Sequence, residues 1–539
     1  MTGSPRAQRA SLLLITLLAL AGGVVLVWAM PFGPAVFSDS AAYFSAARNL
    51  VAGHGLGVFL PSGPLYPWVA FPPLYPWALA GLFVVGLDEL NAARGLNAVL
   101  FAGMVFSAGA LLLRATRRPL LAVLYALALL ASPLMIGRFT AALSEPLYLF
   151  TGLASFGLLS VYLREARRPL ILAAGLAAGL AAIARYQGLV FGALAPLAAL
   201  LAPGLTVRRR LSDMALSGLL AFGPPAAWLL WVWLEPSARA PRRLAPFSDL
   251  SWEGLRPLRA GLVDTFWAWV PGSAWLAEPP YRVRLAVLCV LAVALLVLLL
   301  ASLRAGRRAG GMEQAGTLRW LAALAATFIA GQIVFVTVAY LLAFPRPGIH
   351  QRTFSPVQPM LVLLGMSAAW SLPAATRGGR LARAAAVVAV LAFVVASLPA
   401  SAARIAALQR HGEGYTSASW RDSGTVAAVR ALPASVPLIS NEAAALLFHT
   451  NRSAYDIDEI NRGVPLEGFP RFGDNVQENA QRVFRENGGR LVVFRTIYWQ
   501  LHPIYGDRTA ERLEALTAGL VLVQAFPDGA IYAYPEEDG

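Results

Sequence analysis

One acidic residue stands where it can do chemistry, directly after the first long apolar run of the chain. Asp39 lies within the stretch 37–55, in which Ser38 or Asp39 can cap a short helix and Gly53 can end it. A carboxylate held at a helix start beside a bilayer, where water is scarce, can take a proton from a hydroxyl group. The alternative is a carboxylate that only caps the helix. We therefore treat Asp39 as a candidate catalytic base.

A second acidic residue, Glu145, begins another apolar run. A charge costs about 2.5–3.5 kcal/mol at the centre of a membrane-spanning helix and less near its end, so a function or a partner must offset it. The alternative is a first-turn glutamate that complements the helix dipole. Glu145 is thus a second catalytic candidate. Two such carboxylates can hold a divalent metal, but the sequence offers no further ligand, and we leave the metal open.

Positive charge for a phosphate group must come from arginine, because all 44 basic residues are arginines. The planar guanidinium offers two donors to phosphate oxygens. Each arginine can instead extend along the helix to reach lipid headgroups. Three arginines and one histidine beside apolar runs are the candidates for binding a phosphate group: Arg138, Arg185, His350 and Arg352.

Three tyrosines can order a sugar or a phosphate. Tyr43 follows Asp39 by four residues and shares its helix face. Tyr66 and Tyr75 are expected in two proline-rich turns, 64–67 and 72–76. The alternative for each is an aromatic residue at the lipid–water boundary.

The elements that must position these residues are membrane helices. Of the 539 residues, 58% are hydrophobic and 14% are charged, against about 25% charged in soluble domains. The sequence therefore predicts a polytopic α-helical membrane protein. Eleven apolar runs approach or reach the length of a span: Ser11–Met30, Ala92–Leu113, Leu120–Ile136, Leu143–Leu163, Leu170–Ala184, Gly188–Ala202, Met214–Leu234, Val283–Leu303, Leu318–Phe344, Pro356–Leu372 and Ala384–Pro399.

The arginine clusters predict how these runs cross the membrane. With eleven crossings, six arginine-rich segments fall on one side, which the positive-inside rule makes cytoplasmic. A single broken span over 170–202 would divide them between the two sides. The net charge of +15 is therefore attributed to orientation, and no nucleic-acid partner is expected. The clusters lie at Arg6 and Arg9, at 114–118, at 164–168, at 208–210, at 304–308 and at 377–383.

The chain outside the apolar runs predicts two long outer loops and an outer domain. The loops are 31–91 and 235–282, both within a membrane domain of residues 1–400. Residues 401–539 are expected to form a small α/β domain on the outer side. Its predicted helices are Thr425–Leu432 and Glu478–Glu486, and its predicted strands are Val436–Ile439, Arg490–Phe494, Gly519–Gln524 and Ala530–Tyr534.

Four tryptophans distinguish the second outer loop. Amphipathic segments that lie on a membrane carry tryptophan at the lipid–water boundary. The alternative is that these rings stack on a sugar. The four residues are Trp252, Trp267, Trp269 and Trp275.

The motifs around Asp39 resemble those of a known group of enzymes. An Asp after the first span, then Tyr43 with Arg48-Asn-Leu, a Gly53-x-Gly55 turn and the Pro-Pro-Leu-Tyr-Pro run at 72–76 are similar to the GT-C superfamily of membrane glycosyltransferases. The nearest branch holds protein O-mannosyltransferases and the aminoarabinose transferase of lipid A. The resemblance covers about residues 35–190. Asp39-Ser40 stands where the O-mannosyltransferases have an Asp-Glu pair.

The resemblance implies a fold, a reaction and a location. The expected reaction is the transfer of a hexosyl or pentosyl group from polyprenyl phosphate to a hydroxyl of a glycan, lipid or protein acceptor, with inversion and with Asp39 as base. The expected location is the outer face of a bacterial cytoplasmic membrane. The main alternative is a transporter or flippase of lipid-linked sugars, in which ionisable residues would lie at mid-membrane.

Overall fold

The structure is a computed structural model with two compact units. It describes residues 4–61, 63–69, 71–202, 204–235, 243–244, 254–273, 279–308, 313–344, 346–457 and 488–535. The first unit comprises residues 1–31, 69–75 and 94–409, and the second comprises 32–68, 76–93 and 410–539. The predicted helix Glu478–Glu486 and two of the four tryptophans, Trp252 and Trp275, lie outside the described residues.

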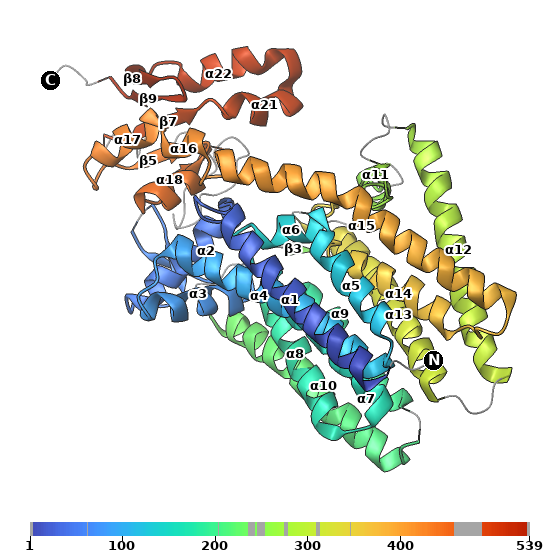
Figure 1. Ribbon diagram of the computed structural model, residues 1–539. Helices are drawn as coiled ribbons and strands as arrows, with labels where there is room; N and C mark the ends of the chain where they lie inside the picture. Colours follow the sequence, from blue (N-terminus) through green and yellow to red (C-terminus); the bar gives the residue numbers. More distant parts are fainter. Residues whose placement is uncertain are drawn as a thin grey trace. The chain divides into compact units, whose positions relative to one another are not determined.

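The first unit is a set of long helices (Figure 1). The short strands β3 and β4 pair in antiparallel fashion. The helices and strands are α1 (Pro5–Ala29), α4 (Glu89–Thr116), α5 (Pro119–Ala131), α6 (Pro133–Phe139), α7 (Glu145–Glu165), α8 (Arg168–Ala184), the 3-10 turn η1 (Tyr186–Gly188), α9 (Leu189–Leu201), α10 (Val207–Leu234), β3 (Arg243–Leu244), α11 (Arg256–Trp267), α12 (Tyr281–Arg308), α13 (Glu313–Leu342), β4 (Ala343–Phe344), α14 (Val357–Ser371) and α15 (Arg377–His411).

Each of the eleven predicted spans forms helix. Seven helices of the described chain are long and apolar enough to cross a membrane, and α5 with α6 adds an eighth if this pair, bent by 61°, is one span. The other three predicted spans are the shorter helices α8, η1 with α9, and α14, so eleven crossings remains a prediction. The last predicted span ended at Pro399, but α15 continues through this proline to His411.

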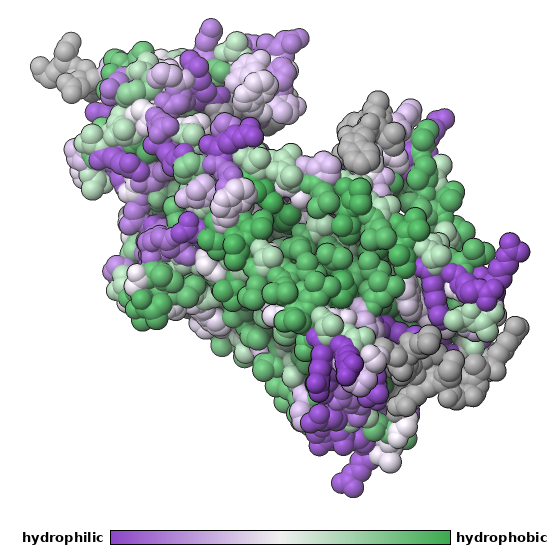
Figure 2. Space-filling model, viewed as in Figure 1, coloured by the Kyte–Doolittle hydropathy of each residue, from purple (hydrophilic) through white to green (hydrophobic). Residues whose placement is uncertain are grey.

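The surface of the first unit fits a bilayer. Figure 2 shows a broad hydrophobic face with hydrophilic patches at its margins. Large apolar side chains such as Leu13, Val290 and Val388 are more than half exposed, as lipid-facing residues would be. The protein is therefore a polytopic α-helical membrane protein with a small sheet domain, as the sequence predicts.

Helix α8 packs against α10 through glycine. A Cβ atom added to Gly175 would lie 2.6 Å from the carbonyl oxygen of Ser217, and one added to Gly179 would lie 2.4 Å from that of Leu220. Both distances are too short for any side chain. The pair Gly175-x-x-x-Gly179 therefore lets two helix backbones approach closely, as small residues do between membrane helices.

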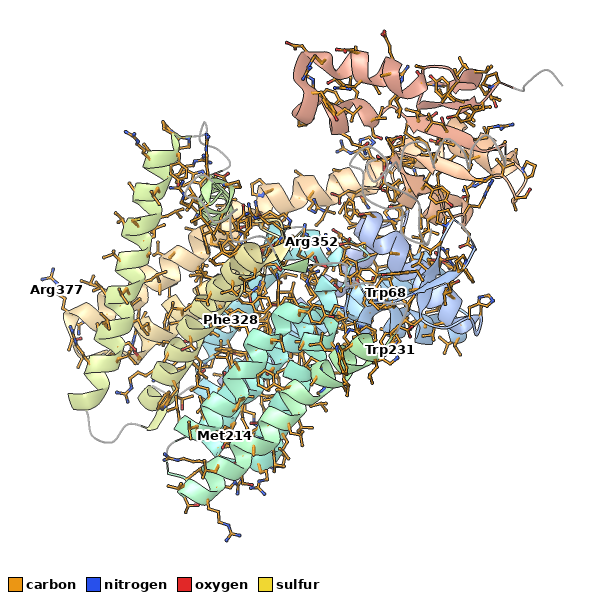
Figure 3. All side chains as sticks on the ribbon, turned by 180° about the vertical axis from the view of Figure 1, so that it is seen from behind. Trp68, Met214, Trp231, Phe328, Arg352 and Arg377 are labelled. Carbon is orange, nitrogen blue, oxygen red and sulfur yellow. The ribbon has the colours of Figure 1, made fainter. Side chains whose placement is uncertain are left out.

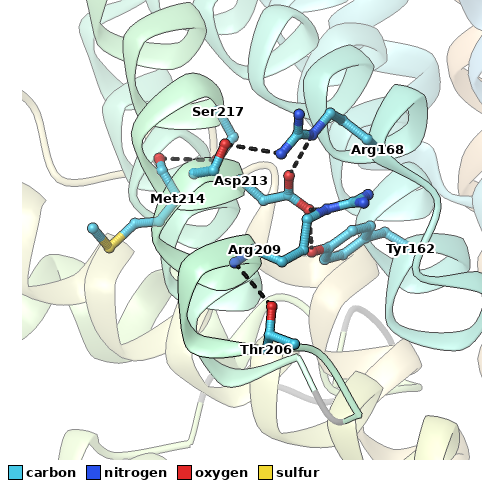
Figure 4. Close-up of polar contacts among 8 residues, drawn as sticks. Tyr162, Arg168, Thr206, Arg209, Asp213, Met214 and Ser217 are labelled. Carbon is cyan, nitrogen blue, oxygen red and sulfur yellow. Dashed lines mark hydrogen bonds and ion pairs between the residues drawn. The ribbon is translucent and has the colours of Figure 1, made fainter.

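A buried carboxylate joins these helices at one end (Figure 4). Asp213 of α10 is fully buried, with Arg168 of α8 at 2.8 Å and Arg209 of α10 at 2.9 Å. The hydroxyl of Tyr162, from α7, donates to the same carboxylate at 3.0 Å. Figure 3 places Met214, the neighbour of Asp213, and Arg352 toward opposite ends of the unit.

Three arginine-rich segments meet at this end of the first unit. Arg114 forms an ion pair with Glu165 at 2.7 Å, and Arg164 donates to the carbonyl oxygen of Arg114 at 2.7 Å. Arg168 and Arg209 share Asp213. The structure thus brings together clusters that the sequence assigned to one side of the membrane, while the identity of that side remains a prediction.

The second unit contains a five-stranded sheet in the order β6-β5-β7-β9-β8. Strand β5 is parallel to β6 and β7, and β9 is antiparallel to β7 and β8. All four predicted strands and the first predicted helix are present, with ends shifted by up to two residues. The elements are α16 (Ala418–Arg421), α17 (Gly424–Ala431), β5 (Leu438–Ser440), α18 (Ala443–Thr450), β6 (Tyr455–Asp456), β7 (Arg490–Phe494), α21 (Ile497–Tyr505), the 3-10 turn η4 (Gly506–Arg508), α22 (Thr509–Thr517), β8 (Val521–Phe526) and β9 (Gly529–Ala533).

Most of the first outer loop belongs to this second unit. It forms α2 (Ser38–Val51), the hairpin of β1 (Gly57–Phe59) with β2 (Leu65–Pro67), and part of α3 (Leu74–Val84). The backbone N–H of Tyr415 donates to the carbonyl oxygen of Val36 at 2.8 Å, and Phe44 of α2 packs against Phe448 of α18 with ring centres 6.1 Å apart. These contacts join the loop to the sheet domain.

We expect Asp213→Asn to destabilise the protein. Removing one partner of a buried ion pair costs about 3–5 kcal/mol, but Arg168 and Arg209 are 40% and 35% exposed, so we expect about 2 kcal/mol. Thermal unfolding in detergent measures the effect. Tyr162→Phe is the control, because it removes one hydrogen bond worth about 1 kcal/mol. A smaller loss for Asp213→Asn than for Tyr162→Phe would contradict the assigned role.

Candidate active site

The first unit contains a second buried carboxylate, and it joins residues that the sequence suggested separately. Glu145 is fully buried, and its Oε1 atom forms ion pairs with Arg185, at 3.0 Å, and with Arg352. Arg138 lies close enough to interact electrostatically with this carboxylate. Three of the predicted phosphate-binding arginines therefore surround one predicted catalytic carboxylate.

The fold brings these residues together from four segments. Helix α7 begins at Glu145, α6 ends one residue after Arg138, and Arg185 adopts an extended conformation where α8 ends and η1 begins. Arg352 lies in the segment between α13 and α14. Each charged residue thus lies at or beyond a helix end, where the chain can leave helical geometry without breaking the bundle.

An aromatic stack packs one turn further along α7. The rings of Tyr148 and Phe191 lie 5.9 Å apart, and those of Phe191 and Phe328 lie 4.2 Å apart, so the stack joins α7, α9 and α13. A Cβ atom on Gly152 would lie 2.3 Å from the Phe191 ring, so this glycine makes room for the ring. Figure 3 labels Phe328 in the interior of the helices.

The carboxylate cluster adjoins a cavity of about 590 Å³. Arg138, His350 and Arg352 line it, together with Arg404 of α15. No acidic side chain of the described residues lines this cavity. The cavity is therefore positively charged, and large enough for a phosphate with a sugar.

His350 is neutral in this setting. Burial lowers the pKa of its imidazole below the ordinary value of 6.5, and the positive charges of Arg352 and Arg138 lower it further. Its Nδ1 atom lies 3.3 Å from the hydroxyl of Thr353. At neutral pH the ring can act as a hydrogen-bond partner but adds no charge to the cavity.

An apolar groove of about 710 Å³ runs between α9 and α13. Its lining includes Gly331 and Leu189, which follows Arg185 by four residues in the sequence. The neighbouring Gln332 donates to the carbonyl oxygen of Thr353 at 3.4 Å, next to Arg352. The groove and the charged cluster are thus built on the same elements.

The surroundings of Glu145 do not fit a divalent cation. Two guanidinium groups already pair with one oxygen of the carboxylate, and a third lies nearby, so a cation at this carboxylate would be repelled. Among the described residues there is no group of three or more His, Cys, Asp or Glu side chains that could hold a metal ion.

Comparison with known proteins identifies the fold. No protein-family profile and no curated protein matches the sequence. ArnT from Cupriavidus metallidurans, solved with undecaprenyl phosphate bound, is similar over 96% of this chain and 98% of its own, with 16% identity and a TM-score of 0.57. The chain has the GT-C fold.

Two other structures with the GT-C fold support this assignment. The Archaeoglobus fulgidus oligosaccharyltransferase, tethered to an acceptor peptide, matches 98% of this chain and 74% of its own, with 13% identity and a TM-score of 0.51. The mycobacterial arabinofuranosyltransferase AftD matches the whole of this chain and 40% of its own, with 17% identity and a TM-score of 0.52. The fold expected from the motifs near Asp39 is confirmed.

The second unit holds Asp39, Tyr43 and Tyr66. Asp39 is partly exposed in the first turn of α2. The expectation that Ser38 or Asp39 caps this helix is wrong, because Phe37 is the N-cap residue and its N–H donates to the hydroxyl of Ser40 at 3.0 Å. Gly53 follows the helix with a φ of +80°, as the sequence predicts. The N-terminal contact that the structure records for this helix is thus made by Ser40.

The tyrosines differ from their predicted surroundings. Tyr43 is buried, and its ring lies 5.5 Å from that of Trp68. Tyr66 lies in strand β2 and Tyr75 in helix α3, so neither is in a turn. The prolines that suggested turns here precede short regular elements or lie within them: Pro67 ends β2 and Pro76 is in the first turn of α3. Tyr75 belongs to the first unit and is fully buried.

Two cavity residues extend the predicted set. Trp269 lines the cavity, which favours the sugar-stacking alternative for this ring, whereas Trp267 is buried among protein side chains. Arg404 was not singled out, because the last span was expected to end at Pro399. The sequence did contain a signal for Arg404. This arginine lies five residues after the last apolar run, so a helix that continues past Pro399 includes it.

We expect the His350 imidazole to titrate below pH 6.5, because burial and two arginines oppose its protonation. Below pH 6.5 the unfolded chain therefore binds a proton at His350 more readily than the folded protein does. The free energy of unfolding falls as the pH decreases from 6.5 toward the lower pKa of the folded state, and above pH 6.5 this loss is absent. NMR of protein labelled at its five histidines measures the titration, and His350→Gln assigns the signal. Arg352→Gln should raise the pKa; an unchanged pKa would contradict the proximity of the two groups.

Proposed function

We propose that this protein is a glycosyltransferase that moves a sugar from a polyprenyl-phosphate donor to an acceptor hydroxyl. The observation that carries the proposal is the positively charged cavity beside Glu145, Arg185 and Arg352 in a protein with the GT-C fold. ArnT, which shares this fold, has been solved with undecaprenyl phosphate. The proposed face is the extracytoplasmic side of a bacterial cytoplasmic membrane.

The cavity would hold the donor head group. Arg138 and Arg352 would bind the phosphate, because each planar guanidinium group can donate two hydrogen bonds to phosphate oxygens. The neutral His350 would contribute a hydrogen bond. The ring of Trp269 faces the same cavity, and a sugar can stack on such a ring. The apolar groove between α9 and α13, whose lining includes Leu189 four residues after Arg185, would hold the first isoprene units.

The buried Glu145 would act as a positioning residue. It pairs with Arg185 and Arg352, and so holds both guanidinium groups in place. Positive charge fixed in advance stabilises the negative charge that develops on the departing phosphate, without reorganisation during the reaction.

Asp39 is the proposed base. The acceptor oxygen attacks the anomeric carbon, its proton passes to the Asp39 carboxylate, and the bond from that carbon to the phosphate oxygen breaks with its electron pair on the phosphate. Attack from the face opposite the phosphate inverts the configuration. The position of Asp39 in the first turn of a helix after the first span, with a partly exposed side chain, supports this assignment. No step runs through a metal ion.

The proposed enzyme and the alternative, a flippase, differ in whether the bond between sugar and phosphate is broken. A flippase would carry the same donor across the membrane without breaking the bond between sugar and phosphate. The charged site described above lies at helix ends, and not midway along the helices, which favours the enzyme. Transfer of labelled sugar to an acceptor separates the two.

We expect Asp39→Asn to reduce sugar transfer by a factor of about 10²–10⁴, the usual contribution of a general base, with little change in stability. Membranes that contain the protein, incubated with labelled polyprenyl-phosphate sugars, provide the assay. Asp507→Asn, the same change at an exposed site of the second unit, is the matched control. Undiminished transfer by Asp39→Asn would remove this residue from the mechanism.

We expect Arg352→Ala to raise the KM for the donor by at least about tenfold, because a hydrogen bond to a charged group contributes about 1.5–3 kcal/mol. The KM for the acceptor should change much less. Arg346→Ala is the control, since Arg346 lies in the same segment but stacks over Tyr340 at 5.2 Å. Equal effects on both substrates would argue against phosphate binding by Arg352.

A further inference from the structure

A fourth arginine reaches the cavity from the last long helix. Arg404 lies on α15 and lines the cavity together with Arg138 and Arg352. Two contacts fix this part of α15 against α5 and α6. The hydroxyl of Ser401 donates to the carbonyl oxygen of Ala131 at 2.8 Å, and the Arg404 side chain packs against Gly137. The position of Arg404 is therefore part of the helix packing.

Gly137 leaves the space that the Arg404 side chain occupies. A Cβ atom added to Gly137 would lie 3.0 Å from Nε of Arg404 and 3.3 Å from its Cζ. Any larger side chain at position 137 would push the guanidinium away from α6. Because Arg138 is the next residue on α6, this packing sets two guanidinium groups on one wall of the cavity.

The charges of the cluster divide into two groups. Glu145 pairs with Arg185 and Arg352, which leaves that group with one net positive charge. Arg138 and Arg404 add two more charges to a cavity that no described acidic side chain lines. A phosphate bound in the cavity would therefore meet guanidinium groups from α6, from α15 and from the segment before α14.

We propose that Arg404 binds the phosphate of the polyprenyl-phosphate leaving group and stabilises the additional negative charge that this phosphate gains during transfer. The inference rests on the proposed function. When the bond from the sugar to the phosphate oxygen breaks, its electron pair stays on the phosphate, whose charge changes from one to nearly two negative units at neutral pH. An interaction that strengthens with this charge accelerates the reaction, and does not merely tighten donor binding.

Three variants of the full-length protein in detergent test this role. Arg404→Gln should weaken the binding of undecaprenyl phosphate by about tenfold or more and leave the binding of undecaprenol, the same tail without phosphate, unchanged. Arg404→Lys should restore part of the loss, because it returns the charge. Arg410→Gln, at an exposed position of the same helix, is the control and should behave as the wild type.

A glycine pair tests the packing. Gly137→Ala should weaken undecaprenyl phosphate binding in the same direction as Arg404→Gln, but less. Gly365→Ala on α14 is its control, because an added Cβ there finds its nearest atom at 3.7 Å. The thermal stability of each variant separates loss of binding from loss of folding. If Arg404→Gln affected undecaprenol and undecaprenyl phosphate equally, or neither, the inference would be refuted.

Kinetics then distinguishes this inference from the function on which it rests. Arg404→Gln should lower kcat and raise the inhibition constant of undecaprenyl phosphate more than the KM of the donor. A wild-type protein that transfers sugar, with an Arg404→Gln variant that shows no such difference, would overturn the role of Arg404 alone. A wild type that binds undecaprenyl phosphate through Arg404 but transfers no sugar would overturn the proposed function alone.

Discussion

The carboxylate of Glu145 is the constraint on which the site depends, because a fully buried charge must be neutralised where it lies. Desolvating a carboxylate costs several kcal/mol, and only paired cations in good geometry compensate for this. The two cations come from the turn after α8 and from the segment before α14. One buried charge therefore specifies the positions of two loops, and with the second loop the position of His350.

A comparable charge lies at the other end of the same helices. Asp213 joins α7, α8 and α10 through one tyrosine and two arginines. Glu145 and Tyr162 are separated along α7 by roughly 25 Å at the usual helical rise, close to the thickness of the hydrocarbon layer. Between the two ends the helices meet through apolar, aromatic and glycine packing, with a hydrogen bond from the hydroxyl of Ser155 to the carbonyl oxygen of Ala174. The charges thus fix the helices where they leave the lipid, and shape complementarity fixes them within it.

The sequence predicted the helices well because lipid leaves so few alternatives. A run of about twenty apolar residues in lipid has to form a helix. Three of the six arginine clusters meet at one end of the first unit, as expected of segments on one side of the membrane. Glu145, Arg185 and Arg352 were identifiable one by one, as charges at the ends of apolar runs. Their pairing was not, since the residues are separated by up to 207 positions and nothing local relates them.

The failures of prediction have specific physical causes. Ser40, and not Ser38, satisfies the start of α2, because its hydroxyl reaches back to the N–H of Phe37. Proline marked turns at Tyr66 and Tyr75, but a strand and the first turn of a helix also accept proline. Pro399 was taken as a stop, yet α15 passes through it, and the residue that was missed as a result is Arg404.

The glycine contact between α8 and α10 has a consequence for biogenesis. Helix α8 has 17 residues, the lower limit for a segment that the translocon will release into lipid by itself. Its glycine face matches the backbone of a helix that leaves the ribosome only after α9 has been synthesised. Helix α7 precedes α8 and packs against it, so α10 completes a packing arrangement that α7 begins. Where α8 inserts as the sequence predicts, its full stabilisation in the membrane is coupled to the arrival of α10.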